Sequence, residues 1–505
     1  MGGFKAKNFF VILITAIAII LSIAIVSSVA FLTFTGIITA NNTSVNSGST
    51  SNQLNNNSDF SSEYIDWSDY SDFSSIDSSY ISFSDISSSE YVSSNGGSSS
   101  NPSSSSVPSS GSSSVTPTPK PPVVQKTGFT KAIWYSTFNL YELIFEKYGY
   151  KESTFKNKIN EMFDNAVSIG ADTVVCHVRG YADAYYPSKY FPWSAHITGV
   201  QGKDPGYDPL EIMINAAHDR GLDFHAWLNP YRISTSTTDH NTLSADHPAR
   251  IWANSSDANK QRNVLKVSSE NPKTRAMYFN PTKPESQQLI INGIREILDN
   301  YDVDGIHIDD YFYPVTDLDF DGVEFAEYKA QGGKLSQADW RRANVSTLVQ
   351  GIYSVVHSYS NVVFGVSPSY HISTNGTDDN YTKQYADLAK WMKTPGYIDY
   401  IVPQIYFGYE HKTADFTKIL NNWLAIPKHD SLKLHIGLAP YKIGTTDGES
   451  DEWKTNNMIL ANQANDAHDK GCNGIFLFDY QTLFNSDSTT TAQRNNLANA
   501  IKSIK

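Results

Sequence analysis

The chain has 505 residues, of which 40% are hydrophobic and 13% aromatic, and this composition is sufficient for a large packed core. Its formal net charge of −13 excludes nucleic acid as an expected partner, because phosphate binding requires a basic surface. Eight acidic residues between Asp59 and Glu90 account for much of this charge, so the remainder of the chain is only mildly acidic.

The N-terminal segment predicts a membrane span. Lys5 and Lys7 lie within residues 1–8, and residues 9–40 form an uncharged, mostly apolar run that exceeds the roughly 20 residues needed to cross a bilayer. The preceding lysines place residues 1–8 in the cytoplasm as a short tail and the remainder of the chain outside. The alternative is a signal peptide that is cleaved, which gives a secreted protein. In both cases we expect the rest of the chain to be extracellular, and in the first it is held at the cell membrane.

Residues 41–126 predict a disordered linker. They are rich in Ser and Asn, show no core-forming pattern, and end in a proline-rich stretch at residues 115–124 that should be extended. Residues 60–91 space Phe, Tyr and Trp between Asp and Ser. We favour a flexible spacer, and a segment that folds on a partner is the alternative.

Strand-like and helix-like segments alternate from residue 127 to residue 505. Eight strands are predicted, at Lys131–Phe138, Thr173–Arg179, Asp223–Pro230, Gly305–Tyr311, Val362–Pro368, Tyr397–Tyr406, Lys433–Pro440 and Gly474–Tyr480. A helical pattern follows each, for example at Glu211–Gly221, Glu285–Tyr301, Asp339–Tyr359 and Glu452–Gly471. Strict alternation indicates a parallel sheet, and eight repeats predict an α/β domain of the (β/α)8 TIM barrel type. The alternative, a doubly wound open sheet, is disfavoured because the first strand is not followed by a glycine-rich phosphate turn.

Side chains of a strand alternate between its two faces, which predicts the residues that point toward the barrel axis. These are His177, Arg179, His225, Trp227, Asn229, His307, Asp309, Gln404 and Tyr406. We therefore expect Arg179, Asn229, Asp309 and Gln404 to meet at the C-terminal mouth, where barrel enzymes hold their active sites.

The inward histidines, His177, His225 and His307, together with His435, are candidate metal ligands. We expect a hydrogen-bonded polar core instead, because they lie deeper than the mouth and no His-x-His or His-x-x-x-His spacing accompanies them. The segment 317–322 resembles the start of a calcium loop, but its twelfth position is a tyrosine rather than a glutamate. No metal and no cofactor are expected. Cys176 and Cys472 lie in apolar β-like runs and are expected to be buried thiols.

Several long motifs resemble the glycosyl hydrolase-like 10 family. They lie at Tyr186–Ser194, Gly202–Pro209, His225–Arg232, Asp304–Pro314, Asp339–Asn344 and Asp399–Tyr406, collinear from about residue 129 to 480. The resemblance implies a barrel similar to those of the amylase clan and hydrolysis of O-glycosidic bonds, in some members of peptidoglycan glycan strands stripped of their peptides. Two departures concern substrate fit. The segment 247–252 lacks the usual acidic–aromatic pair after His-Pro, and Asn280 stands where an aspartate is common.

Hydrolysis of a glycosidic bond needs an acid on the leaving oxygen and a group that stabilises the oxocarbenium-like centre. The predicted fifth, sixth and seventh strands end without an acid, and Asp479 should face away from the axis. Asp309 and Asp310 are therefore the predicted catalytic pair. One is the general acid, and the other orients a substrate acetamido group or acts as the nucleophile. The alternative is that the pair caps a helix or binds Arg179. Further candidate acids on loops are Asp183, Asp378, Asp379 and Glu410.

The remaining predicted site residues bind substrate. They are Arg179, Asp183, Trp227, Asn229, Tyr231, Tyr311, Tyr313, Gln404 and Tyr406. Aromatic faces can stack on sugar rings, although some of these rings must belong to the core, Trp227 first among them. The segment Ile233–Lys283 should form a wall or lid. The expected partners are a polysaccharide and, through the span, a membrane, and the oligomeric state is not fixed by the sequence. Two alternative functions remain: a sugar-binding barrel without turnover, and a metal-dependent cell-wall deacetylase or amidase.

Overall fold

The computed structural model of the chain describes residues 126, 128–235, 237–267, 276–309, 312–314, 321–373, 375–447 and 450–504. All of them belong to one compact unit, Ser113–Lys505. The expected membrane span at residues 9–40 and the expected linker up to residue 125 lie outside the described residues. Among the residues that are described, no helix has both the length and the apolar character needed to cross a membrane.

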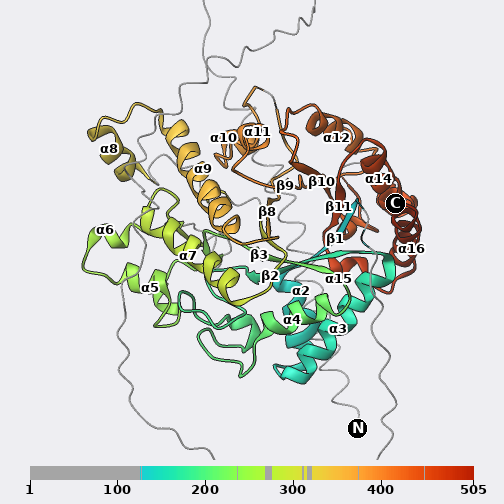
Figure 1. The fold of residues 1–505 in the computed structure, drawn as a ribbon, viewed down its shortest axis with the longest axis horizontal. Helices are drawn as coiled ribbons and strands as arrows, with labels where there is room; N and C mark the ends of the chain where they lie inside the picture. The colour runs from blue at the N-terminus through green and yellow to red at the C-terminus, as the bar shows by residue number, and fades with distance from the viewer. Residues whose placement is uncertain are drawn as a thin grey trace, which may run out of the picture. The chain divides into compact units, whose positions relative to one another are not determined.

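Eight parallel strands close into a barrel, which confirms the predicted (β/α)8 fold (Figure 1). The strands are β1 Thr130–Tyr135, β2 Thr173–Arg179, β3 Asp223–Leu228, β7 Gly305–Ile308, β8 Val363–Val366, β9 Tyr400–Ile401, β10 Lys433–Leu438 and β11 Gly474–Leu477. Around the barrel they follow the order β1-β11-β10-β9-β8-β7-β3-β2. Each corresponds to a predicted strand, and their C-terminal ends meet at one mouth because all of them are parallel.

Helices surround the strands (Figure 1). Outside the β3–α7 insertion they are α2 Thr137–Leu140, η3 Tyr141–Glu146, α3 Glu152–Ile169, η4 Ala195–Ile197, α4 Pro209–His218, α7 Pro284–Asn300, α8 Gly322–Ala330, α9 Gln337–Val356, α10 Asp379–Thr382, α11 Leu388–Lys393, α12 Phe416–Leu424, η7 Pro440–Lys442, α13 Glu452–Thr455, α14 Ile459–Asp469, α15 Tyr480–Leu483 and α16 Ser488–Ser503. Several begin at an N-cap whose side chain accepts a backbone N–H, such as Asp208 for α4 and Ser336 for α9.

One predicted helix is wrong. The pattern over Glu452–Gly471 predicted a single helix, but the structure has α13 and α14 with a break between them. Asn456 lies at the break, and its side-chain oxygen accepts the N–H of Met458 at 2.9 Å. An asparagine that bonds the backbone two residues onward favours a turn over a helix, which accounts for the interruption.

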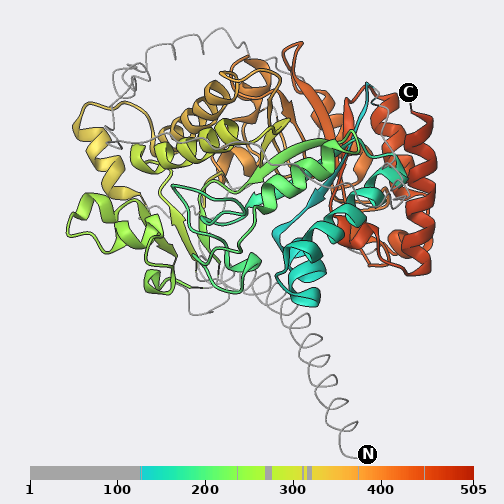
Figure 2. The ribbon, with the colours of Figure 1, turned by 60° about the horizontal axis from the view of Figure 1, so that its bottom comes forward.

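A large insertion separates β3 from α7. It contains a small antiparallel sheet in the order β4-β6-β5, formed by β4 Arg232–Ser234, β5 Val264–Val267 and β6 Ala276–Phe279. It also contains η5 His240–Thr242, α5 Pro248–Ala253 and α6 Ala258–Gln261. Figures 1 and 2 place α5, α6 and α8 on one side of the barrel strands, opposite α14 and α16. The predicted wall segment is therefore a folded lobe with its own secondary structure.

Glycines make room for rings inside the barrel. A Cβ on Gly365 of β8 would overlap the ring of Tyr400, and a Cβ on Gly305 of β7 would lie 2.7 Å from the ring of His225. The barrel interior holds a cluster of Ala132, Trp134, Val175, Trp227, Tyr400, Val402 and Phe476, distinct from the outer core beneath the helices. Both cysteines are free and buried, as predicted. The large interior rings fill the barrel below the mouth.

Candidate active site

The floor of the mouth is a chain of hydrogen bonds between buried rings. Trp134 Nε1 can only donate, so Nε2 of His307, 3.3 Å away, accepts. Nδ1 of His307 then carries the proton and donates to the Tyr400 hydroxyl at 2.9 Å, and that hydroxyl donates to His225 Nδ1, also at 2.9 Å. Burial lowers the pKa of His307 well below its usual value and lowers the pKa of His225 in the same direction. These neutral, hydrogen-bonded histidines form the predicted polar core.

His177 fixes the orientation of Asn229. The backbone N–H of Thr137 donates to His177 Nδ1 at 3.0 Å, so Nε2 of His177 carries the proton and donates to Asn229 Oδ1 at 3.3 Å. The amide nitrogen of Asn229 must therefore point the other way. Asn229 is 1% exposed, and Nδ2 has no hydrogen-bond partner among the described residues.

A further donor without a partner lies two residues earlier in β3. Trp227 is 5% exposed, and its Nε1 finds no acceptor within the described part of the chain. With Asn229 Nδ2 it forms a row of two buried donors at the C-terminal end of β3. Buried donors are normally satisfied, so such a row indicates a place where a ligand or solvent oxygen binds. The Tyr231 hydroxyl also lacks a partner among the described residues, but its side chain belongs to the outer core beneath the helices.

Asp309 lies next to this row. The pairing of β3 with β7 aligns Leu228 with Ile308, and continuing the register by one residue brings Asn229 beside Asp309. Asp309 is buried, with 8% of its surface exposed. The structure thus brings together the predicted inward pair from β3 and β7. Asp310 and Tyr311 lie outside the described residues, so their predicted roles stay predictions.

The predicted inward orientation of Arg179 is wrong. The register between β2 and β3 shifts between His177 and Arg179, where β2 carries one extra residue. This bulge turns the guanidinium outward, so that it lies 4.3 Å from the ring centre of Phe191. It also lies against α7, where a Cβ on Gly293 would overlap its Nη1 atom. Arg179 therefore packs between the barrel and a helix, away from the mouth.

The other predicted binding residues take different places. Tyr313 is 5% exposed and donates its hydroxyl to Asp321, so it belongs to the core. Gln404 is part-exposed and donates through Nε2 to Ser367 O at 3.0 Å. Tyr406 is part-exposed, with its ring stacked 5.9 Å from the ring of Phe478. Of these three, Gln404 and Tyr406 lie at the mouth.

The predicted loop acids differ in availability. Asp183 is buried, and burial raises its pKa to about 6 despite a hydrogen bond from Gln201 at 3.0 Å. Asp378 caps α10, and Asp379 forms an exposed ion pair with Lys383 at 3.0 Å. Glu410 is exposed and accepts from the Ser450 hydroxyl at 3.0 Å. As predicted, Asp479 points elsewhere: it caps α15 and accepts from Asn139 Nδ2 at 2.8 Å.

A buried ion pair anchors the chain just after the Asp309 segment. Arg341 donates from Nε and Nη2 to the two oxygens of Asp321, at 2.7 and 2.6 Å. Asp321 is fully buried and also accepts from Tyr313, while Arg341 Nη1 donates to the Tyr385 hydroxyl at 2.8 Å. Such a bidentate, charge-assisted contact is rigid. Residue 321 is thereby fixed against α9.

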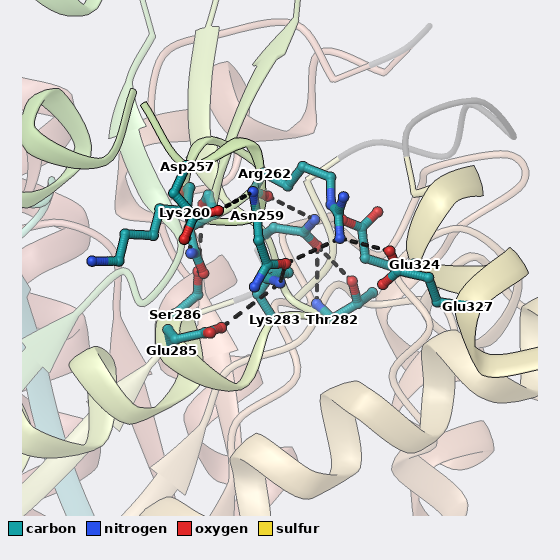
Figure 3. A network of polar contacts seen from close by, with 12 residues as sticks. Asp257, Asn259, Lys260, Arg262, Thr282, Lys283, Glu285, Ser286, Glu324 and Glu327 are labelled. Atoms are coloured by element: carbon teal, nitrogen blue, oxygen red, sulfur yellow. Dashed lines mark hydrogen bonds and ion pairs between the residues drawn. The ribbon is translucent and has the colours of Figure 1, made fainter. Parts of the chain in front are cut away.

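A second polar network ties α8 to the insertion lobe (Figure 3). Arg262 forms ion pairs with Glu324 at 2.9 Å and Glu327 at 2.8 Å. Asn280 Nδ2 donates to the carbonyl of Arg262 at 3.0 Å, and its Oδ1 accepts from the N–H and hydroxyl of Thr282. An ionised aspartate has no donor, so an aspartate at this position would lose the bond to the Arg262 carbonyl that Asn280 makes.

Sequence reasoning missed a set of aromatic side chains at the mouth. They are Phe138, Tyr141 and Tyr181 after β1 and β2, and Tyr441 and Phe478 after β10 and β11. Their common signal is an aromatic residue within about six positions of a strand end, on the side that carries barrel active sites. For metals, the described residues contain no group of three His, Cys, Asp or Glu side chains arranged to hold an ion.

Comparison with known proteins identifies relatives of this barrel. The sequence profile of the family Glycosyl hydrolase-like 10 matches residues 130–455. Glycosyl hydrolase YngK of Bacillus subtilis is 38% identical over 311 residues, which cover 59% of this chain and 58% of YngK. Glycosyl hydrolase DigH of Escherichia coli K12 is 32% identical over 319 residues, which cover 59% of this chain and 69% of DigH.

The chain therefore spans only 58% of the length of YngK. Among solved structures, the PgaB (BpsB) glycoside hydrolase domain from Bordetella bronchiseptica aligns with a TM-score of 0.48 at 11% identity. That alignment covers 73% of this chain and 99% of the domain, and a similarity of this size carries no argument about function.

Proposed function

Because this chain belongs to the glycosyl hydrolase-like 10 family, we propose that it is a glycosidase that hydrolyses O-glycosidic bonds in a cell-wall or related polysaccharide. Peptidoglycan glycan strands without stem peptides are the substrate we test first. Two relatives that carry the name glycosyl hydrolase support the reaction class.

The row of two buried donors beside Asp309 is the observation that carries this proposal. Trp227 Nε1 and Asn229 Nδ2 are N–H donors at the end of β3 that find no acceptor among the described residues. Sugar hydroxyls, ring oxygens and acetamido carbonyls are acceptors of this kind. A carboxyl group within the same enclosure is the group that glycosidic cleavage requires.

The proposed chemistry centres on Asp309 and Asp310. One carboxyl group protonates the leaving oxygen, and the other orients the substrate acetamido group or acts as the nucleophile. The floor beneath Asp309, formed by His307, Tyr400 and His225, is a set of neutral hydrogen-bonded rings.

The proposal extends to the setting of the enzyme. Residues 9–40 anchor the chain in the cell membrane and residues 41–126 carry the barrel away from the bilayer surface, with the barrel outside the cell. A cleaved N-terminal segment gives the secreted alternative. Protease added to intact cells, whose membrane it does not cross, tests this arrangement. The barrel should be cleaved if it lies outside the cell.

Turnover by the full chain tests the reaction. Glycan strands with and without stem peptides are incubated with the wild type and with the variants Asp309→Asn and Asp310→Asn, and the products are identified by mass spectrometry. We expect new reducing ends with the wild type and a loss of about 100-fold or more in each variant, since general acid catalysis contributes 10²–10⁴-fold. Asp379→Asn, at an exposed acid paired with Lys383, is the matched control.

The outcomes separate the competing functions. Full activity in Asp309→Asn contradicts the assigned role. Loss of acetyl groups or stem peptides without new reducing ends indicates a deacetylase or amidase, and binding without any product indicates a sugar-binding barrel. Thermal unfolding of each variant shows whether a loss of activity reflects a loss of folding.

A further inference from the structure

Aromatic side chains follow an unbroken arc of strand ends around the mouth. In the barrel order β9, β10, β11, β1 and β2 are neighbours. Tyr406, Tyr441, Phe478, Phe138 and Tyr181 follow the ends of these five strands in the same order. Asp309, at the end of β7, lies on the part of the rim that the arc leaves free.

The Phe138 cluster forms one end of this arc and consists of Phe138, Tyr141, Tyr181 and His196. The rings of all three aromatics contact the His196 ring, with centroids 6.3, 5.6 and 5.7 Å away, and Tyr181 is stacked on it at 10°. Phe138 is 51% exposed although its neighbours Thr137 and Asn139 are buried. The cluster therefore holds a large apolar ring rigidly in solvent.

The contacts of α2 place the Phe138 cluster at the mouth. The N–H of Thr137 reaches His177 inside the barrel, and Asn139 bonds Asp479 at the end of β11. On the other side, the Tyr181 hydroxyl contacts Thr235 Oγ1 at 3.3 Å, beyond the end of β3. Phe138 thus lies on the rim, between the ends of β1, β2 and β11.

The Tyr441 cluster forms the other end and consists of Tyr406, Tyr441 and Phe478. Tyr441 is 38% exposed, and its ring meets those of Tyr406 at 5.7 Å and Phe478 at 6.0 Å. The Phe478 ring lies 6.5 Å from Trp227, one of the two residues in the donor row. This cluster therefore adjoins the proposed reaction site.

We propose that the two clusters are sugar-binding subsites that hold one polysaccharide strand across the mouth, with exposed Phe138 and Tyr441 each stacked on a pyranose ring. This inference rests on the proposed function and names how its substrate is held. Aromatic faces suit the apolar face of a sugar ring, because they bury C–H groups and leave the hydroxyls at the ring edge in water. Of the aromatics expected from the sequence to stack, Trp227, Tyr231 and Tyr313 are at most 5% exposed and have no such face to offer, whereas Tyr406 is part-exposed and belongs to the Tyr441 cluster.

Two separated subsites have a consequence for substrate length. Phe138 and Tyr441 follow β1 and β10, which β11 separates, so a disaccharide is expected to stack on one ring at a time. A longer oligosaccharide contacts both and gains the second stack without a second association event. Affinity should therefore rise with chain length in the wild type. Removal of one ring should abolish most of that rise and leave the affinity for a disaccharide nearly unchanged.

Binding and turnover of peptide-free peptidoglycan oligosaccharides, from disaccharide to octasaccharide, test this inference with the full chain. The variants are Phe138→Ala and Tyr441→Ala, with Phe138→Trp as the conservative replacement. Tyr148→Ala is the matched control, since Tyr148 is 44% exposed but lies against Lys147 and Lys158 outside both clusters. Affinity is measured by calorimetry on each variant combined with Asp309→Asn, so that the oligosaccharide is not hydrolysed. The values of kcat and KM are measured on the single variants.

We expect Phe138→Ala to weaken octasaccharide binding about tenfold, which is the size of one aromatic stack, and to raise KM with little change in kcat. Phe138→Trp should retain the wild-type affinity. The inference is overturned if Phe138→Ala and Tyr441→Ala behave like Tyr148→Ala, or if the wild type binds the disaccharide and octasaccharide equally. Binding that responds as expected without any turnover keeps the subsites and contradicts the proposed hydrolysis instead.

Discussion

Burial governs the behaviour of Asp183. This carboxyl group lies just beyond the end of β2 with 4% of its surface exposed, and burial raises its pKa from 3.8 to about 6. A pKa that is raised by folding means that the folded state holds the proton more tightly than the unfolded chain. The group therefore favours folding below pH 4, and that contribution is lost as the pH rises through about 6.

Asp183→Asn removes this penalty. The amide can still accept the Gln201 hydrogen bond, and it carries no charge to desolvate. We expect the variant to be more stable than the wild type at pH 7.5, by up to about 3 kcal/mol, and equally stable at pH 4. Denaturant unfolding at the two pH values measures this difference, with Asp430→Asn on an exposed loop as the control. A stability difference that does not vary with pH contradicts the assignment.

Residue type alone did not identify which aromatics are exposed at the mouth. Tyr313 and Tyr231 were predicted to bind substrate because they follow strand ends, yet both are buried. Phe138 is exposed only because α2 buries its neighbours on either side. Exposure at such positions is decided by how the loops pack, and the local sequence does not specify that packing.

At the scale of elements, the packing of β8 against β9 depends on one missing side chain. Gly365 aligns with Tyr400, and its lack of a Cβ leaves room for the tyrosine ring inside the barrel. The ring then joins the hydrogen bonds of His307 and His225. Strand packing and the floor of the mouth are therefore coupled.

Gly365→Ala should destabilise the barrel. The added methyl group overlaps the ring of Tyr400, and overpacking of this kind typically costs about 1–3 kcal/mol. Gly322→Ala is the control, because a Cβ there meets nothing within 4 Å. The free energy of unfolding is measured in denaturant. In a double-mutant cycle, Tyr400→Ala should reduce the cost of Gly365→Ala, and independent effects of the two changes contradict the proposed contact.

Helices and strands were predictable where a single periodic pattern runs through the whole element. The alternation of strand-like and helix-like segments gave all eight strands. The alternation of side chains along each strand placed His307, His225 and Tyr406 correctly. It failed at Arg179, because one extra residue in β2 inverts the face of every side chain after it. A bulge of this kind leaves no mark in the hydrophobic pattern, since both faces of a barrel strand are buried.

At the scale of the whole molecule, the insertion lobe and the barrel are joined near the segment that follows Asp309. Arg262 from the lobe pairs with Glu324 and Glu327 of α8 (Figure 3). Asp321, just before α8, is held by Arg341 of α9. The segment between residues 309 and 321 thus begins at a barrel strand and ends at two charged anchors. The lobe predicted as a wall is thus joined to α8 by ion pairs.

Arg262→Met should loosen this link while keeping most of the apolar stem. Its side chain is 30% exposed, so the loss in global stability should be small, about 1 kcal/mol, whereas α8 loses both of its ion pairs. We expect faster amide hydrogen exchange in α8 than in α9. Lys383→Met, which removes an exposed pair with Asp379, is the control. Unchanged exchange in α8 contradicts an anchoring role for Arg262.

The hydrogen-bonded floor has a direction. Because an indole nitrogen only donates, the bond from Trp134 sets the proton position on His307, and this in turn sets the donor at Tyr400 and the acceptor at His225. Burial lowers the pKa of both histidines, which favours their neutral forms. The pH dependence of the site is therefore expected to come from groups at the rim, among them carboxyl groups and His196, and not from the floor.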